Sequence, residues 1–340
     1  MGLLSGIFGK KKEEPAPPAG AEKEEVKAET QEAPPEAGQE KEGGVPDFHK
    51  LIWLQLLFRE KPERPAPELF AQKLGEKLSC DIDIVAQQED GLYSYAAKGL
   101  MVEYKDNAKV PAQVLIAPPN AFDPGTIDDF SRSQLWDVRD GAELLDSCKY
   151  MVMCSDFMAS GLAYRERARL LTAWLETALE LFPTCDGVWT PSAGKLLTRE
   201  QALKNPLTGD SRFLWYGVNV RLFNISDGVE GEMVMDTLGL YALGLPDVQL
   251  HFHGLDPNPV SNYLYNVGQY LYDNDVPIKP GETVDGVNAQ GIDRNIQWEC
   301  RYENALIRPE RPVMDICPGE YAAGRREPRS GNGGKSRNKK

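Results

Sequence analysis

Two histidines near the middle of the chain have a spacing that suits a metal site. His251 and His253 are separated by one residue. On a β-strand, alternate side chains point to the same face, so both imidazoles would approach one ion. Asp247 falls on the same face of that strand, and Asp256 follows in the turn. Two histidines with a carboxylate are a ligand set of mononuclear metal enzymes. The alternative is a solvent-facing pair on a half-buried strand.

A second candidate site lies in the residues that lead into this strand. Asp236, Thr237 and Asp247 can form the polar rim of a binding groove, with Trp189 nearby. Tryptophan at such a position would supply apolar contact area. The structural alternative is that Asp236 or Thr237 caps a short helix, while the side chain of Asp247 closes the following turn. Both interpretations stay open at this stage.

Signatures of common enzymes are missing from the sequence. It contains no Walker A loop, no GxGxxG, no GxSxG and no HExxH motif, and its 3 histidines allow few histidine-dependent mechanisms. The 6 cysteines form no CxxC pair, and each lies in or beside an apolar stretch, which is typical of reduced core thiols. We therefore expect no cofactor, and we expect binding rather than catalysis.

Charge is unevenly distributed along the chain. Without the terminal segments Lys10–Gly44 and Arg325–Lys340, the central part has 25 basic and 41 acidic residues, a net charge of about −16. An acidic surface repels phosphate backbones, so the folded part is not expected to bind nucleic acid. The same charge favours capture of a basic protein partner.

Both ends of the chain have the composition of unstructured segments. Residues 1–45 form an acidic, proline-rich tether with Val26 as the only large apolar residue between Glu13 and Gly44. The tether begins with Leu3, Leu4, Ile7 and Phe8 on one helical face before three lysines, a pattern that allows weak contact with a membrane surface. Residues 325–340 form a basic tail.

No run approaches the roughly 20 apolar residues that span a bilayer. The basic residues of the N-terminus follow its apolar stretch, the reverse of a secretory signal. These features predict a cytoplasmic location.

Strand-like and helix-like segments alternate in the central part. Apolar or alternating runs predict strands over the following segments: His49–Phe58, Gly91–Tyr104, Val110–Ala117, Tyr150–Asp156, Gly187–Thr190, Phe213–Asn224, Glu232–Met235, Asp247–His253 and Thr283–Val287. Helical spacing predicts a helix opened by Pro65 and Pro67, and further helices over Tyr164–Phe182, Thr198–Lys204 and Val260–Asp273.

Tyr164–Phe182 is the strongest helix of the sequence. Leu171, Leu175 and Leu179 form its apolar stripe, and we expect Arg165, Arg167 and Arg169 on the solvated face.

Two similar halves are expected from this order of elements, at about 46–140 and 141–324, packed in one globular α+β body over 46–324. Hairpins among the strands exclude a purely parallel sheet, so we expect a mixed β-sheet with packed helices.

The segment Met235–Phe252, which reads MDTLGLYALGLPDVQLHF, resembles the signature of the bacterial family known as domain of unknown function 4261. Other parts follow in the same order, namely the long helix before Gly187-Val-Trp189, the helix Val260–Asp273 and the segment Ile278–Gly286. The resemblance runs from about Leu51 to Gly286 and implies no biochemical role.

Two functions remain as hypotheses. The first is a cytoplasmic, non-catalytic module that binds a protein partner, as an immunity-type or stress-associated factor would. The alternative is a metal-dependent hydrolase centred on His251 and His253.

Overall fold

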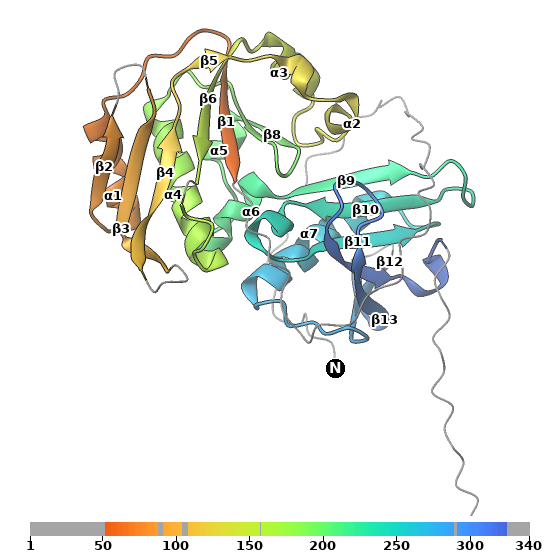
Figure 1. Ribbon diagram of the computed structural model, residues 1–340. Helices are drawn as coiled ribbons and strands as arrows, with labels where there is room; N and C mark the ends of the chain where they lie inside the picture. The colour runs from red at the N-terminus through yellow and green to blue at the C-terminus, as the bar shows by residue number, and fades with distance from the viewer. Residues whose placement is uncertain (1–51, 88–90, 104–107, 157, 289–290, 325–340) are drawn as a thin grey trace, which may run out of the picture.

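The computed structural model describes residues 52–87, 91–103, 108–156, 158–288 and 291–324. In this part of the chain two β-sheets lie side by side with helices packed against them, which confirms the expected α+β class (Figure 1). The tether at 1–45, the tail at 325–340 and the predicted turn at Asp106-Asn107 lie outside the described residues. None of the described helices is long and apolar enough to cross a bilayer.

The first sheet has eight strands and is antiparallel throughout, in the spatial order β2-β3-β4-β6-β1-β7-β8 with β5 beside β6. Its strands are β1 (Trp53–Phe58), β2 (Ile82–Gln87), β3 (Tyr93–Glu103), β4 (Lys109–Ile116), β5 (Asn120–Ala121), β6 (Tyr150–Ser155), β7 (Gly187–Thr190) and β8 (Lys195–Thr198). Strand β1 lies inside the sheet, and its alternate residues Leu54, Leu56 and Phe58 are fully buried. This alternation places one apolar row against the helices.

Helices α1 (Pro67–Leu78) and α4 (Tyr164–Leu181) share an apolar core with this face of the sheet. Helix α1 begins at a proline, whose missing N–H has no intrahelical partner at that position anyway. The predicted stripe of α4 is confirmed, because Leu171, Leu175 and Leu179 are all buried.

Arg167 corrects the expected solvated face of α4. Its guanidinium is buried, donates from Nε to Asp156 Oδ2 at 2.5 Å, and donates from Nη1 to the carbonyl of Ala242 at 2.7 Å. The position lies beside the apolar stripe, where a long side chain turns inward once a carboxylate is present to pair with it.

The opposite face of the first sheet carries a smaller core over its β1–β7–β8 side. Helices α2 (Asp129–Arg132) and α3 (Gly141–Ser147) belong to the segment that covers it. Leu57, Trp189 and Leu196 contribute the strand side chains of this core.

The second sheet is mixed, in the order β12-β13-β14-β11-β10-β9, with β11 and β14 as its parallel pair. Its strands are β9 (Asn219–Asn224), β10 (Met233–Leu238), β11 (Asp247–Phe252), β12 (Thr283–Asn288), β13 (Gly291–Asn304) and β14 (Pro312–Cys317). Helix α7 (Pro257–Asp273) packs on one face, where Val248, Leu250 and Phe252 of β11 meet Leu264 and Leu271 in one core.

Short helical segments complete the chain: η1 (Pro124–Thr126), α5 (Arg199–Leu203), η2 (Gly209–Ser211), α6 (Arg212–Gly217), η3 (Leu240–Leu243) and η4 (Gly319–Tyr321). Helix α6 replaces the first part of the strand that we expected over Phe213–Asn224. Its aromatic residues bury equally well in a helix and in a strand, so a short apolar run does not distinguish them.

The division between the sheets falls between Thr198 and Asn219, not at residues 140 and 141. Strand β6 pairs with β1 across 92 to 102 positions of sequence, from Phe58↔Tyr150 to Trp53↔Ser155, so the second β–α–β unit completes the first sheet. No linker separates these segments, and nothing local in the sequence predicts that β6 pairs with β1.

The elements packed on the two sheets also contact each other. Arg165 Nη2 donates to the carbonyls of Tyr272 and Asp273, at 3.1 and 2.7 Å. The core of the first sheet also includes Leu240 and Leu243 from η3.

Candidate functional site

Three of the four groove candidates meet in the second sheet. Asp236 and Thr237 lie near the end of β10, and Asp247 begins the neighbouring strand β11. Thr237 Oγ1 donates to Asp247 Oδ1 at 3.0 Å and accepts from the backbone N–H of Val248 at 2.8 Å. All three candidates have 0% exposure. The sequence therefore placed them together correctly, but the expectation of an exposed polar rim is wrong.

Arg311 is the residue that these carboxylates surround. Its Nε donates to Asp247 Oδ2 at 2.9 Å, and its Nη2 donates to Asp236 Oδ2 at 2.7 Å. The same Nη2 donates to the carbonyl of Thr237, while Nη1 donates to the carbonyls of Ile307 and Pro309. All five N–H groups of a guanidinium are thus used.

A second arginine neutralises the remaining charge. Arg221 of β9 donates from Nε and Nη2 to the two oxygens of Asp236, at 2.9 and 2.7 Å. Two arginines and two aspartates therefore form a buried cluster without net charge, which we call the Arg311 network (Arg221, Asp236, Asp247 and Arg311). A buried charge is stable only when it is paired and hydrogen-bonded in this way.

The loop over residues 305–311 explains why such charges are buried. Arg221 Nη1 donates to the carbonyl of Arg308, and Gln249 Oε1 accepts from the N–H of Leu306 at 2.8 Å. Together with the two carbonyls bound by Arg311, these contacts satisfy the backbone of a loop that crosses the sheet face. The network therefore acts as a structural clamp on the β13–β14 loop.

Burial and pairing act in opposite directions on the titration of the network. Burial raises the pKa of the Asp247 carboxyl above its ordinary value of 3.8, whereas the charge of Arg311 lowers it. The carboxyl also accepts from the N–H of Leu240 at 3.0 Å, which closes the turn as the structural alternative anticipated. Asp247, rather than Asp236 or Thr237, is therefore the residue that binds the first turn of η3.

Trp189 does not join the other three candidates. It lies on β7 of the first sheet, opposite Gln55 and Leu196, and is only 5% exposed. The sequence interpretation of Trp189 as a groove residue is therefore wrong, and its ring belongs to the smaller core under α2 and α3.

The histidine pair also lacks the geometry of a metal centre. His251 Nε2 lies 2.7 Å from Glu232 Oε1. The carboxylate of Glu232, the residue before β10, is therefore already the partner of that nitrogen. Asp247, the expected carboxylate ligand, is bound to Arg311 and Thr237. In the described part of the chain no group of three or more His, Cys, Asp or Glu side chains could hold a metal ion. The described structure therefore brings no third ligand to His251 and His253.

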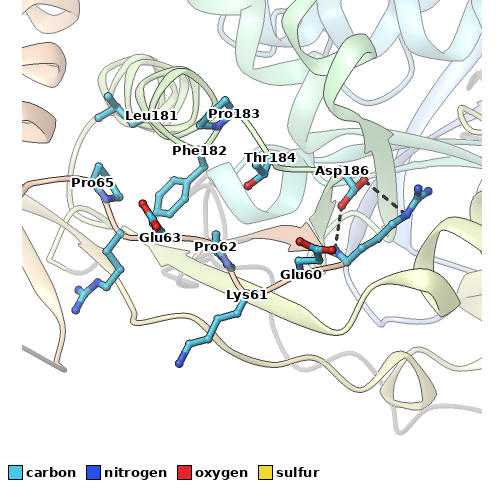
Figure 2. Close-up of a pocket in the computed structure, with 12 residues that line it drawn as sticks. Glu60, Lys61, Pro62, Glu63, Pro65, Leu181, Phe182, Pro183, Thr184 and Asp186 are labelled. Atoms are coloured by element: carbon cyan, nitrogen blue, oxygen red, sulfur yellow. Dashed lines mark hydrogen bonds and ion pairs between the residues drawn. The ribbon is translucent and has the colours of Figure 1, made fainter.

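A surface cavity of about 700 Å³ lies elsewhere, beside the first sheet. One wall is the segment Arg59–Pro65, which connects β1 to α1, and the other is the segment Leu181–Asp186 after α4. Figure 2 shows the Phe182 ring between the end of α4 and the segment with Pro62 and Pro65. The lining residues are Arg59, Glu60, Lys61, Pro62, Glu63, Arg64, Pro65, Leu181, Phe182, Pro183, Thr184 and Asp186.

One ion pair closes one end of this cavity. The backbone N–H of Arg59 donates to Asp186 Oδ2 at 2.9 Å, and its Nε lies 3.6 Å from Asp186 Oδ1. Sequence reasoning missed the site because its two walls are more than a hundred residues apart. The prolines at 62, 65 and 183 were the available signal, since they predict breaks in helix and strand on both walls.

Comparisons with known proteins place the second sheet in context. Residues 236–317 run from within β10 to the end of β14 and include α7, but they exclude β9, the edge strand of the second sheet. These residues match the model of the family described as Domain of unknown function (DUF4261), which confirms the resemblance noted around Met235–Phe252. The match contains Asp236, Asp247 and Arg311 and excludes Arg221 and the cavity. No curated protein and no solved structure gave a significant match.

Proposed function

We propose that this protein is a non-catalytic binding module that holds an extended segment of a protein partner in the cavity beside Arg59–Pro65. The observation that carries the proposal is the lining of that cavity: the segment 61–65 without helix or strand structure on one side, the end of α4 and the turn at Pro183-Thr184 on the other, and charged side chains along the first.

The dimensions support a peptide as the occupant. Residues 61–65 have neither helix nor strand structure and contain two prolines. Five residues of extended chain span about 15 Å at roughly 3.1 Å each. Spread along that length, a volume of about 700 Å³ has a cross-section of roughly 45 Å². One chain in stacked sheets occupies nearly the same area, about 4.8 Å by about 10 Å.

The lining favours binding over catalysis. None of the twelve lining residues is a histidine or a cysteine, and Thr184 supplies the side-chain hydroxyl. An activated nucleophile needs a base within hydrogen-bond reach, and Thr184 forms no side-chain hydrogen bond to another described residue. The Arg311 network is closed to solvent, and no observation favours the metal-dependent hydrolase.

The proposal includes the setting expected from the sequence. We place the module in the bacterial cytoplasm, which agrees with six free cysteines, four of them buried. The acidic central part disfavours nucleic acid as the partner of the folded body. The N-terminal segment that the sequence assigns to weak membrane contact lies outside the described residues.

Position-specific photo-crosslinking tests the proposal. A photoreactive amino acid replaces Glu63 in the cavity and, as a matched control, Glu230 in the exposed β9–β10 turn. We expect the Glu63 position, and not the Glu230 position, to give a discrete adduct in a lysate of the source cell. The captured protein, once purified, should protect Lys61 from amine-reactive labelling. Equal labelling with and without it, or adducts at neither position, would exclude the cavity as the binding site.

A further inference from the structure

The charged residues of the cavity divide into those already committed and those that are not. Asp186 is paired with Arg59, as described above. Arg64 donates from Nη2 to the carbonyl of Gly91 at 2.8 Å, and its guanidinium stacks 3.7 Å above the centre of the Tyr93 ring. Both arginines therefore already have partners within the protein.

Glu60 and Glu63 are different. Within the described part of the chain, neither carboxylate forms a hydrogen bond or an ion pair. Figure 2 shows the Glu63 carboxylate beside the Phe182 ring, while the Lys61 side chain extends from the other side of the segment, away from α4. The uncommitted charge on the side of the segment that faces α4 is thus negative.

The backbone adds acceptors and removes donors. Pro62, Pro65 and Pro183 have no N–H, so three of the twelve lining residues offer only a carbonyl. Lysine and arginine side chains donate hydrogen bonds and accept none, which makes them the complement of such a wall. The overall acidic charge acts in the same direction by attracting cationic ligands.

We infer that the segment held in the cavity is cationic: an extended stretch of a partner protein whose lysine or arginine side chains pair with Glu60 and Glu63. This inference rests on the proposed function and specifies its ligand. Apolar or proline residues between the cations lie against Pro65, Leu181 and Pro183, the lining apolar residues that are not buried.

Fluorescence anisotropy with defined peptides tests this inference. The probes are labelled hexapeptides that alternate proline with lysine, with glutamine or with glutamate. We expect the lysine peptide to bind about tenfold more tightly than the glutamine peptide, since two exposed charge pairs of up to about 1 kcal/mol each allow such a factor. Binding should weaken between about 50 mM and about 500 mM salt, because exposed pairs are screened.

The control variant has the same net charge as the test variant. E60Q/E63Q should lose about tenfold in affinity for the lysine peptide, whereas E230Q/E320Q, with changes at two exposed positions of the second half, should retain it. Equal loss in both variants would show non-specific attraction to an acidic surface and overturn the inference. Equal binding of the lysine and glutamine peptides would do the same. If Glu63 crosslinks a partner whose bound segment is neutral or acidic, the proposed function stands and the cationic ligand is excluded.

Discussion

The Arg311 network and the cavity beside Arg59–Pro65 contain the same types of charged residue in opposite states. In the network, Arg311 is 1% exposed and all of its donors have partners. In the cavity, the side chain of Arg59 is 61% exposed and its Nε lies 3.6 Å from the nearest carboxylate oxygen. Glu60 and Glu63 have no partner in the described chain.

Solvent access accounts for this difference. Removing charges from water costs several kcal/mol per ion, so buried charges persist only in closed, fully paired sets. Exposed charges remain solvated and need no partner. The carboxylates of the cavity can therefore still pair with another molecule, whereas the groups of the Arg311 network already pair with one another and with the 305–311 loop.

The family match adds a second consequence. Residues 236–317 include most of the network and none of the cavity. The matched residues of the network therefore hold the second sheet together. The residues that line the proposed binding site, 59–65 and 181–186, all lie outside the match.

The largest expected effect comes from breaking the network at Arg311. Arg311→Met leaves Asp236 and Asp247 buried beside one remaining arginine, and unfolding in urea should show a loss of about 3–5 kcal/mol. The pKa of Asp247, already raised by burial, rises further without Arg311. Stability tied to a raised carboxyl pKa is lost as pH rises through it, so the difference from the wild type should shrink as pH falls toward 3.8.

Arg308→Met serves as the matched control for that loss. The Arg308 side chain is 66% exposed and pairs with Asp128, which is 54% exposed, so the substitution should cost under about 1 kcal/mol. Similar losses in both variants would mean that the network contributes no more than a surface pair, and the contrast between the two regions would fail.

The second-largest loss of stability should come from a substitution in the core of α4, the helix that precedes one wall of the cavity. Leu175 on α4 is 1% exposed, and Leu175→Ala should cost about 2–5 kcal/mol through the cavity it leaves. Arg169→Ala, on the exposed side of the same helix, should cost under about 1 kcal/mol. The reverse order in a denaturant titration would show that the buried face of α4 has been assigned incorrectly.

Periodic features of this fold could be predicted from the sequence. Leu171, Leu175 and Leu179 mark a buried helical face by spacing alone, and the apolar run at Tyr150–Ser155 marks a strand. Asp236 and Asp247 could be expected to lie close together, because only a short turn separates their strands.

Contacts between residues far apart in the sequence could not be predicted. Arg221 and Arg311 lie in sequence among other charged residues, and nothing local distinguishes them from solvated side chains. Their burial depends on β9 and on the 305–311 loop reaching the same carboxylates. Strands β13 and β14 were missed although both have strand patterns: Ile296, Trp298, Cys300 and Tyr302 alternate with polar residues in β13, and β14 is a mostly apolar run. The cavity depends on β1 and β7 being neighbours.

Asp128 should show a smaller effect with the opposite pH dependence. It caps α2 by accepting from the N–H of Ser131 at 2.8 Å, and Asp128→Ala should cost about 1 kcal/mol. Hydrogen bonds from Ser131 hold the pKa of Asp128 below 3.8. Its contribution is therefore present above that value and lost as pH falls through the lowered pKa. Urea titrations at pH 7 and near pH 3 measure the change, and a difference that grows toward pH 3 would contradict the assignment.

The smallest effect on stability should come from the two carboxylates that we assign to binding. Neither Glu60 nor Glu63 has a partner in the described chain, so E60Q/E63Q should change the free energy of unfolding by no more than about 0.5 kcal/mol. Asp186 is the internal comparison, because it accepts from the N–H of Arg59, and Asp186→Ala should cost about 1 kcal/mol. Urea titration of both variants gives the two values. A loss above about 1.5 kcal/mol in E60Q/E63Q would mean that these carboxylates hold the wall of the cavity in place. The reduced peptide affinity of that variant would then report on folding, and the contrast between saturated and uncommitted charge would no longer locate the binding site.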